Sequence, residues 1–279
     1  MTTKMDVISG SEINIKIGDA TICYDDFGTS EIPIIFIHGF PFNKETWQPQ
    51  VEFLRARHRV IAYDIRGFGK STSGKEESSI GLFADDLIDF MDALQIKKAI
   101  VCGLSMGGYI LLNAAHRYPE RFEGLVLCDT QCNPDTAEGR EKRFDSIKKI
   151  EAEGLGDYAD ASVKNLFCKN TFDNNKKLVS DIHETILTTS PSAISATLSA
   201  LANRSDTCPI LSEISLMTLI ICGKEDVITP PAKAEILNTG IKNSSLVIIE
   251  EAGHLSNLEQ VDEFNHALGK LITKTLNRF

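Results

Sequence analysis

The sequence predicts an α/β fold built on a mostly parallel sheet. Short apolar runs alternate with segments of helical character over residues 34–127, and the same alternation resumes at residue 217. This alternation is typical of parallel strands joined by helices that pack on the sheet. Two segments near the start of the chain alternate polar and apolar residues around Gly18-Asp19, which predicts an N-terminal antiparallel hairpin.

The expected elements can be placed in chain order. The hairpin strands cover residues 13–17 and 20–27. Four further strands are expected at 34–37, 59–63, 99–102 and 124–127, with helices near 47–55, 80–94 and 106–117. After the break, strands are expected at 217–222 and 246–249, with helices near 231–238 and 257–276.

The strand pattern disappears between residues 131 and 208. This stretch is polar and charged, and Phe144, Ile147, Ile150 and Leu155 recur at roughly helical spacing. It interrupts the alternation directly after the sixth strand. We therefore expect residues 1–130 and 209–279 to form the α/β core and residues 131–208 to form a helical insertion, which is either a cap over the site or a plain surface insertion.

Composition excludes several classes of protein. The net charge of −10 argues against a nucleic-acid partner, and no apolar run is long enough to span a membrane. Residues 1–6 lack the apolar core of a signal peptide. The seven cysteines show no metal-binding spacing, and Cys102, Cys128 and Cys222 lie in apolar strand runs. Free thiols would suit a reducing compartment, so we expect a cytoplasmic protein. The cysteine spacing predicts no metal site.

The stretch Gly103-Leu104-Ser105-Met106-Gly107 indicates a nucleophilic serine. It reads G-x-S-x-G, and it stands between the expected strand at 99–102 and the expected helix at 106–117. Strand, glycine-flanked serine and helix form the arrangement of a nucleophile elbow. The sharp turn strains the serine backbone and exposes its hydroxyl, while the glycines avoid collisions between strand and helix.

A serine hydroxyl needs a base, and that base needs an orienting carboxylate. With this elbow the expected chain order is Ser, acid, His. His254 follows the strand at 246–249 after a glycine, which makes it the candidate base. Three carboxyl groups lie just beyond strand ends, and Asp226, Glu225 and Asp129 are therefore the candidate acids.

Backbone amides supply the expected oxyanion hole. The run His38-Gly39-Phe40-Pro41 follows the strand at 34–37, and Met106 follows the serine at the start of a helix. The amides of Phe40 and Met106 are the expected donors, and the helix dipole at Met106 also favours negative charge. We expect His38 to hold the oxyanion loop and Asp64 and Arg66 to be structural, while Trp47 could either line a pocket or pack on a helix.

These residues resemble the α/β-hydrolase superfamily. The resemblance extends from Ser11 to about Lys274 and includes His38-Gly39-Phe40-Pro41, the elbow, Gly253-His254 and the run 63–71, Tyr-Asp-Ile-Arg-Gly-Phe-Gly-Lys-Ser. Within the superfamily, the chain resembles 3-oxoadipate enol-lactonases and small carboxylesterases. The cues are Gly103 to Tyr109, Cys128-Asp129-Thr130 and the run 135–140.

The resemblance implies a serine hydrolase that acts on a small ester or lactone. Ser105, Asp226 and His254 would form the catalytic triad, with Phe40 and Met106 at the oxyanion hole, and no cofactor or metal would be needed. The resemblance favours Asp226 over Glu225 and Asp129 as the acid, and it makes residues 131–208 a helical cap. Two alternatives remain: a cofactor-free haloperoxidase or perhydrolase, and a signalling receptor or regulator built on the same fold. The expected partner is the small-molecule substrate alone, and the oligomeric state is not predicted.

Overall fold

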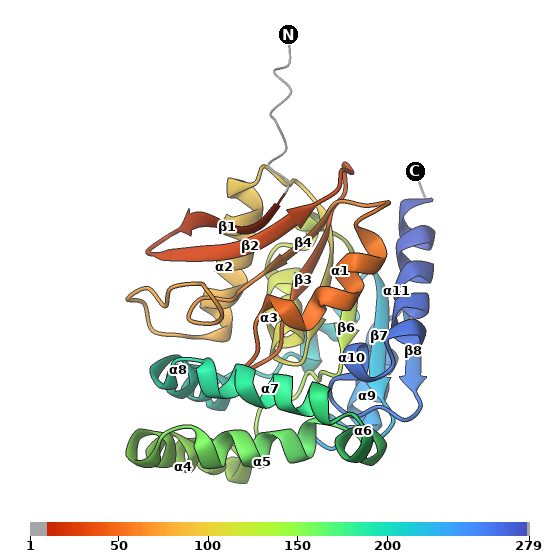
Figure 1. Cartoon of the computed structure of the whole chain (residues 1–279). Coiled ribbons are helices and arrows are strands. Elements are labelled where there is room, and N and C mark those ends of the chain that lie inside the picture. The colour runs from red at the N-terminus through yellow and green to blue at the C-terminus, as the bar shows by residue number, and fades with distance from the viewer. Residues whose placement is uncertain (1–9, 278–279) are drawn as a thin grey trace.

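The computed structural model describes residues 10–277 and confirms the predicted α/β fold. Eight strands form one sheet in the order β1-β2-β4-β3-β5-β6-β7-β8 (Figure 1). Strands β1 (Gly10–Ile17) and β2 (Ala20–Phe27) form the predicted antiparallel hairpin. Strand β2 is also antiparallel to β4 (Val60–Tyr63), and all other neighbours are parallel.

Apart from its edge strand, the parallel part of the sheet is almost entirely buried on both faces. Its other strands are β3 (Ile34–Ile37), β5 (Ala99–Leu104), β6 (Phe122–Cys128), β7 (Met217–Gly223) and β8 (Ser244–Ile249). Along β3, Ile34 and Phe36 belong to one apolar cluster, whereas Ile35 and Ile37 belong to the other. This two-sided burial explains why the strands are continuous apolar runs in the sequence.

Helices cover each face. The helices α2 (Ile80–Ala93), α3 (Met106–Arg117) and α9 (Pro231–Gly240) pack on one side, and α1 (Gln48–Leu54) and α11 (Val261–Leu276) pack on the other. The expected helix near 257–276 is divided, because Gln260 leaves helical geometry (φ −129°, ψ 64°) after α10 (Ser256–Glu259). The side chain of Glu259 binds the amides of Gly253 and Cys168, a tertiary contact that periodicity does not reveal.

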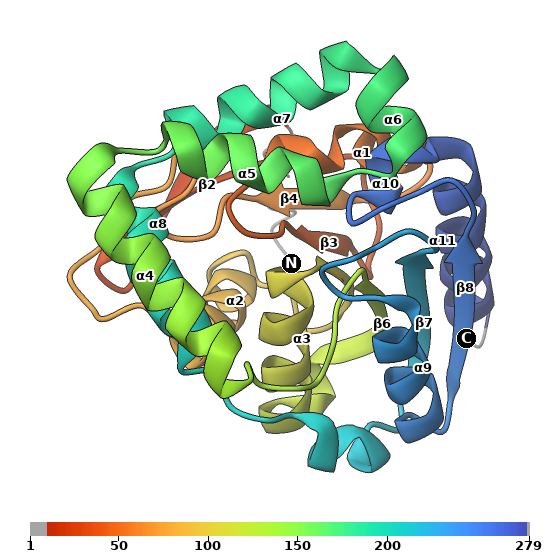
Figure 2. The same ribbon diagram turned by 90° about the horizontal axis from the view of Figure 1, so that it is seen from below.

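The segment after the sixth strand is helical, as predicted. It contains α4 (Ala137–Glu153), α5 (Gly156–Leu166), α6 (Lys169–Asn174), α7 (Lys176–Thr188) and α8 (Pro191–Ala202). In Figure 1 these helices lie below the sheet, on the side away from both chain ends, and Figure 2 shows them from below. Helix α4 packs on α8 through Ile150, Ile194 and Leu198. We call this segment the insertion, and the domain division at residues 131 and 208 stays a prediction.

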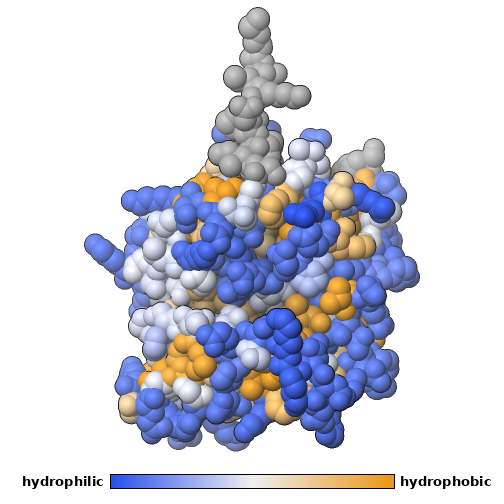
Figure 3. Space-filling view, in the orientation of Figure 1, coloured by the Kyte–Doolittle hydropathy of each residue, from blue (hydrophilic) through white to orange (hydrophobic). Residues whose placement is uncertain are grey.

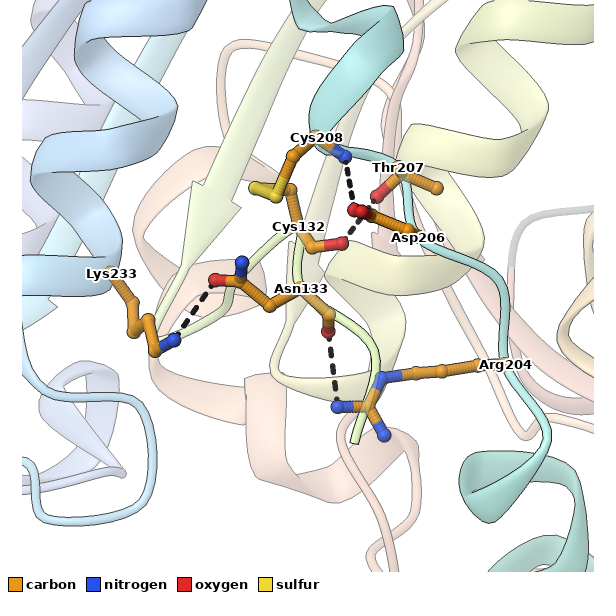
Figure 4. Close-up of a disulfide and its surroundings, with 7 residues drawn as sticks. All are labelled: Cys132, Asn133, Arg204, Asp206, Thr207, Cys208 and Lys233. Atoms are coloured by element: carbon orange, nitrogen blue, oxygen red, sulfur yellow. Dashed lines mark hydrogen bonds between the residues drawn. A yellow bond between two sulfur atoms is a disulfide. The ribbon is translucent and has the colours of Figure 1, made fainter. Parts of the chain in front are cut away.

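The expectation that the thiols are free is wrong for two of the seven cysteines. Cys132 and Cys208 form a disulfide at the two ends of the insertion (Figure 4). The amide and hydroxyl of Thr207 both donate to the carbonyl of Cys132, so the returning chain passes directly beside the departing one. Because the pair is 76 residues apart, sequence spacing did not reveal it. The argument from free thiols to a cytoplasmic location therefore no longer holds.

Within residues 10–277, no helix is long and apolar enough to cross a membrane. On the face drawn in Figure 3, hydrophobic residues lie in small groups separated by hydrophilic ones. The signal-peptide prediction concerned residues 1–6, which lie outside the described residues.

The disulfide leads to a stability prediction. Replacing Cys132 and Cys208 together by serine should lower the free energy of unfolding by about 2–4 kcal/mol, because the unfolded chain gains the freedom of a long loop. Urea unfolding of the variant and the wild type measures this difference. As a control, denatured protein should react with about five equivalents of a thiol reagent before reduction and seven after it, since the other five cysteines are free. Seven before reduction would contradict the pairing.

Candidate active site

Ser105 lies in a sharp turn between β5 and α3. Its backbone has φ 52° and ψ −111°, a conformation that non-glycine residues rarely adopt. The amide of Ser105 donates to the carbonyl of Cys128 at 2.8 Å, and the hydroxyl of Thr130 donates to the carbonyl of Ser105 at 2.7 Å. The surrounding structure thus holds the strained residue from both sides.

The glycines around Ser105 are required by close packing. A Cβ on Gly103 would lie 2.4 Å from the carbonyl oxygen of Gly107, and one on Gly107 would lie 2.4 Å from that of Ile37. A Cβ on Gly108 would lie 2.4 Å from the hydroxyl of Thr130. The G-x-S-x-G pattern therefore reflects steric needs on β3, β5 and α3.

His254 bridges Ser105 and Asp226. Its Nε2 lies 2.8 Å from the Ser105 hydroxyl, and its Nδ1 lies 2.8 Å from Oδ2 of Asp226. The three side chains come from the carboxyl ends of β5, β7 and β8, and all are buried. The residues that we predicted as nucleophile, acid and base are thus brought into one chain of hydrogen bonds.

Asp226 is held as an anion by its surroundings. Its Oδ1 accepts from the amides of Ile228 and Thr229, and its Oδ2 accepts from the Thr229 hydroxyl at 2.7 Å. Burial alone would raise the pKa of Asp226, but His254 and the Thr229 donors outweigh burial, so its pKa lies below the usual value. Thr229 was missed by sequence reasoning, and its position three residues after the acid was the available signal.

The same pairing acts on His254. Burial alone would lower the pKa of its imidazole, but the charge and hydrogen bond of Asp226 reverse the effect and raise the pKa above 6.5. If Nδ1 carries a proton and donates to Asp226, Nε2 is free to accept the proton of the Ser105 hydroxyl. The arrangement favours the tautomer that a base toward Ser105 requires.

Neither alternative acid is hydrogen-bonded to His254. Glu225 is exposed, and its carboxylate accepts from the amide of Lys169 in the insertion. Asp129 is fully buried, but its carboxyl oxygens bond to the Gly223 amide and the Ser256 hydroxyl, not to His254. Burial and the nearby Asp226 carboxylate raise the pKa of Asp129 to about 8.

Asp129, Cys222 and Asp226 bring possible metal-ligand atoms within 4.8 Å of one another. Both carboxyl groups are already engaged by protein hydrogen bonds. Burial also raises the pKa of the Cys222 thiol, which disfavours the thiolate that a metal would need. The donor set is better described as part of the hydrogen-bonded frame around His254.

The expected oxyanion donors lie beside Ser105. Phe40 and Met106 both line the cavity onto which Ser105 opens. Within residues 10–277, neither backbone amide donates to another protein group. Met106 is also the first residue of α3, where the helix dipole is positive. Their role as oxyanion donors stays a prediction.

The structure also places the other residues that the sequence singled out. His38 is buried, contacts the carbonyl of Gly39 at 2.8 Å and accepts from the Ile65 amide, so it braces the oxyanion loop. Its burial lowers the imidazole pKa to about 4. Trp47 is buried against Phe36 and Phe264 and lies outside the cavity.

Asp64 and Arg66 also hold structure. Asp64 accepts from the amides of Lys44 and Lys70, and Arg66 pairs with Asp86 and Asp19. His183 contacts Asp160 at 2.8 Å and does not line the cavity.

A cavity of about 510 Å³ opens over Ser105 and His254. Its core side includes Val227 and Ile228, which are exposed apolar residues directly after Asp226. The insertion supplies the opposite wall through Arg143, Tyr158, Ser162, Asn165, Leu166 and Leu201. The carbonyl of Leu166 accepts from the His254 amide at 2.9 Å, so the insertion is attached directly to the His254 loop.

Arginines of the insertion differ in position. Arg143 lines the cavity and binds Asp135, whereas Arg204 is buried and shares the same carboxylate. Arg204 also lies over the ring of Tyr109. Two guanidinium groups on one carboxylate leave a surplus positive charge beside the cavity. Arg140 binds Asn203 on the surface and does not line the cavity.

Comparisons with known proteins identify the family to which this chain belongs. Residues 32–149 match the family model described as alpha/beta hydrolase fold. The chain is 30% identical to "3-oxoadipate enol-lactonase 2" of Acinetobacter baylyi, over 90% of this chain and 92% of the relative. The chain belongs to the α/β-hydrolase superfamily, which confirms the resemblance inferred from its motifs.

Two solved structures are similar over almost the whole chain. A thermophilic esterase from Thermogutta terrifontis, with malate bound, has a TM-score of 0.88 and 34% identity, covering 92% of this chain and 94% of the esterase. The enol-lactonase from Burkholderia xenovorans has a TM-score of 0.88 and 26% identity, covering 94% of this chain and all of that one (100%). The relatives thus include both enol-lactonases and bacterial esterases.

The contact between His254 and Asp226 predicts a pH effect. In the wild type, the His254 imidazole should titrate above pH 6.5, and in Asp226→Asn the midpoint should fall because the anionic partner is lost. NMR titration of the histidine resonances measures both values. Asp160→Asn, which removes a partner of His183 instead, is the matched control and should leave His254 unchanged. An unaltered His254 midpoint in Asp226→Asn would contradict the pairing.

Proposed function

We propose that the protein is a serine hydrolase that cleaves a small ester or lactone. The observation that carries this proposal is the position of His254, whose two ring nitrogens lie 2.8 Å from the Ser105 hydroxyl and 2.8 Å from Asp226. Nucleophile, base and orienting acid in this geometry are the parts needed for acyl transfer. Membership in the α/β-hydrolase superfamily and the esterase and enol-lactonase relatives support it.

In the proposed reaction, the Ser105 oxygen attacks the substrate carbonyl while His254 Nε2 takes its proton. Asp226 stabilises the cationic imidazole that forms. His254 then gives the proton to the leaving oxygen, which leaves an acyl group on Ser105. A water molecule, activated by neutral His254, cleaves that ester and releases the acid. In a lactone, the leaving oxygen stays attached to the same product.

Negative charge on the carbonyl oxygen needs donors close to Ser105. We assign these to the amides of Phe40 and Met106, which donate to no other protein group among the residues that the structure describes. Loss of one oxyanion donor typically costs about 10²–10³ in turnover, so the oxyanion loop is a major part of the proposed catalyst.

The insertion acts in this proposal as a cap that selects the substrate. It forms one wall of the cavity, and that wall carries Arg143. The surplus positive charge of Arg143 and Arg204 on Asp135 suits a carboxylate at the far end of the substrate. Binding of malate by the Thermogutta esterase and the lactonase relatives fit the same chemistry. We therefore infer an anionic ester or enol-lactone as the preferred substrate.

The first functional prediction concerns the nucleophile. Ser105→Ala should abolish labelling by a fluorophosphonate and reduce ester hydrolysis to background, because the attacking oxygen is missing. Far-UV circular dichroism checks that the fold is kept, and Ser162→Ala, which removes another cavity-lining hydroxyl, is the matched control. Full labelling of Ser105→Ala would move the nucleophile elsewhere. Turnover that requires hydrogen peroxide would favour perhydrolysis over hydrolysis.

The second functional prediction concerns the charge of the substrate. Arg143→Gln should lower kcat/KM about 10–100-fold for a carboxylate-bearing enol-lactone, the range expected from losing a hydrogen bond to a charged group. Hydrolysis of a neutral p-nitrophenyl ester should change little. Arg140→Gln, on the same helix but outside the cavity, is the control and should affect neither substrate. Equal losses on both substrates would contradict selective binding of an anion.

A further inference from the structure

The turn formed by Cys128, Asp129 and Thr130 contacts all three segments that carry the proposed triad. The carbonyl of Cys128 accepts from the Ser105 amide, and the hydroxyl of Thr130 donates to the Ser105 carbonyl. The middle residue, Asp129, is fully buried and has a positive φ of 43°. The reaction proposed above gives this carboxyl group no role.

Asp129 connects the two loops that carry Asp226 and His254. Its Oδ1 accepts from the Gly223 amide at 2.8 Å, and Gly223 is the last residue of β7, three before Asp226. Its Oδ2 lies 2.5 Å from the hydroxyl of Ser256, two residues after His254. One side chain directly after β6 therefore holds a loop on each side of the Asp226–His254 hydrogen bond.

The two loops are also packed tightly where Asp129 reaches them. A Cβ on Gly223 would lie 2.0 Å from the carbonyl oxygen of Gly253, and the Glu225 amide donates to the carbonyl of Ala252. Asp129 itself is anchored, because its amide donates to the carbonyl of Ile221 at 2.8 Å. A shift of Asp129 would therefore move the backbone that carries the acid and the base relative to each other.

We propose that Asp129 is a positioning residue, which aligns Asp226 and His254 by clamping the ends of their loops through Gly223 and Ser256. This inference rests on the proposed function. Asp129 would act on the rate through the alignment of the other two side chains, since a displacement near 1 Å of catalytic groups can cost about 10²-fold in rate.

The ionisation of Asp129 is consistent with this role. Burial first, and then the Asp226 carboxylate, raise the pKa of Asp129, against the lowering effect of His254 and of the two hydrogen bonds. The Gly223 amide and the Ser256 hydroxyl both donate to this carboxyl group. An asparagine keeps an oxygen that accepts from the Gly223 amide and offers an N–H to the Ser256 oxygen, whose hydroxyl can rotate, whereas alanine offers neither.

The test compares three variants with an ester substrate at pH 7. Asp129→Ala should lower kcat about 10–100-fold with KM changed less than about threefold, because alignment and not binding is lost. Asp129→Asn should keep kcat within about fivefold of the wild type. Asp26→Ala is the matched control: Asp26 is a buried carboxylate on β2 that pairs with Arg59, so its loss should lower Tm but leave kcat unchanged.

The outcomes separate the hypotheses. Wild-type kcat in Asp129→Ala, an equal loss in Asp129→Asn, or an equal loss in the Asp26→Ala control would each overturn the positioning role. If Asp129→Ala does not fold, Ser256→Ala takes its place in the test. The Ser256→Ala variant should lower kcat without raising KM, and an unchanged kcat would again overturn the proposal. Fluorophosphonate labelling of the wild type is the independent check, because its failure would remove the proposed function itself.

Discussion

The strained turn at Ser105 is the constraint on which the rest of this structure depends. A backbone with a φ of 52° at a non-glycine residue costs about 1–3 kcal/mol and persists only where neighbours prevent relaxation. Here α3 approaches β5 and the end of β3 so closely that Gly103 and Gly107 have no room for a side chain. The turn after β6 then holds the Ser105 backbone from the other side through Thr130. The same packing sets the start of α3 beside the hydroxyl, where its dipole favours negative charge.

The buried carboxyl groups of Asp129 and Asp226 lie close to each other, and their surroundings shift their pKa values in opposite directions. Asp226 receives donors from Thr229, Ile228 and His254, which together stabilise its charge against burial. Asp129 receives fewer donors and faces the charge of Asp226, so it holds its proton to higher pH. Two anions at this depth would repel each other strongly, and the hydrogen-bond pattern decides which one carries the charge. Asp226 therefore faces His254 as the group whose charge is stabilised, whereas the charge of Asp129 is disfavoured.

The insertion is fastened to the core near the site and at its own ends. Leu166 accepts from the His254 amide, and Glu259 binds both Gly253 and Cys168. The disulfide between Cys132 and Cys208 joins the two ends of the insertion, and Arg204 binds the neighbouring Asn133 carbonyl (Figure 4). These contacts hold the wall that carries Arg143 at a defined place over Ser105. In the proposed function, this wall would select the substrate through the charges of Arg143, Arg204 and Asp135.

The sequence by itself determined the α/β class, nearly all strand positions and the Ser105 turn. Those features are local, because buried parallel strands are continuous apolar runs and the steric needs of the turn are met by adjacent glycines. It also indicated His254 as the base from its place after a strand end, and the family resemblance of its motifs ranked Asp226 first among three candidate acids. Only the tertiary structure decided that Asp226 and not Asp129 contacts His254, that Cys132 meets Cys208, and that Arg143 alone of three arginines reaches the cavity. Each of these depends on distances between segments far apart in the chain, which residue spacing does not encode.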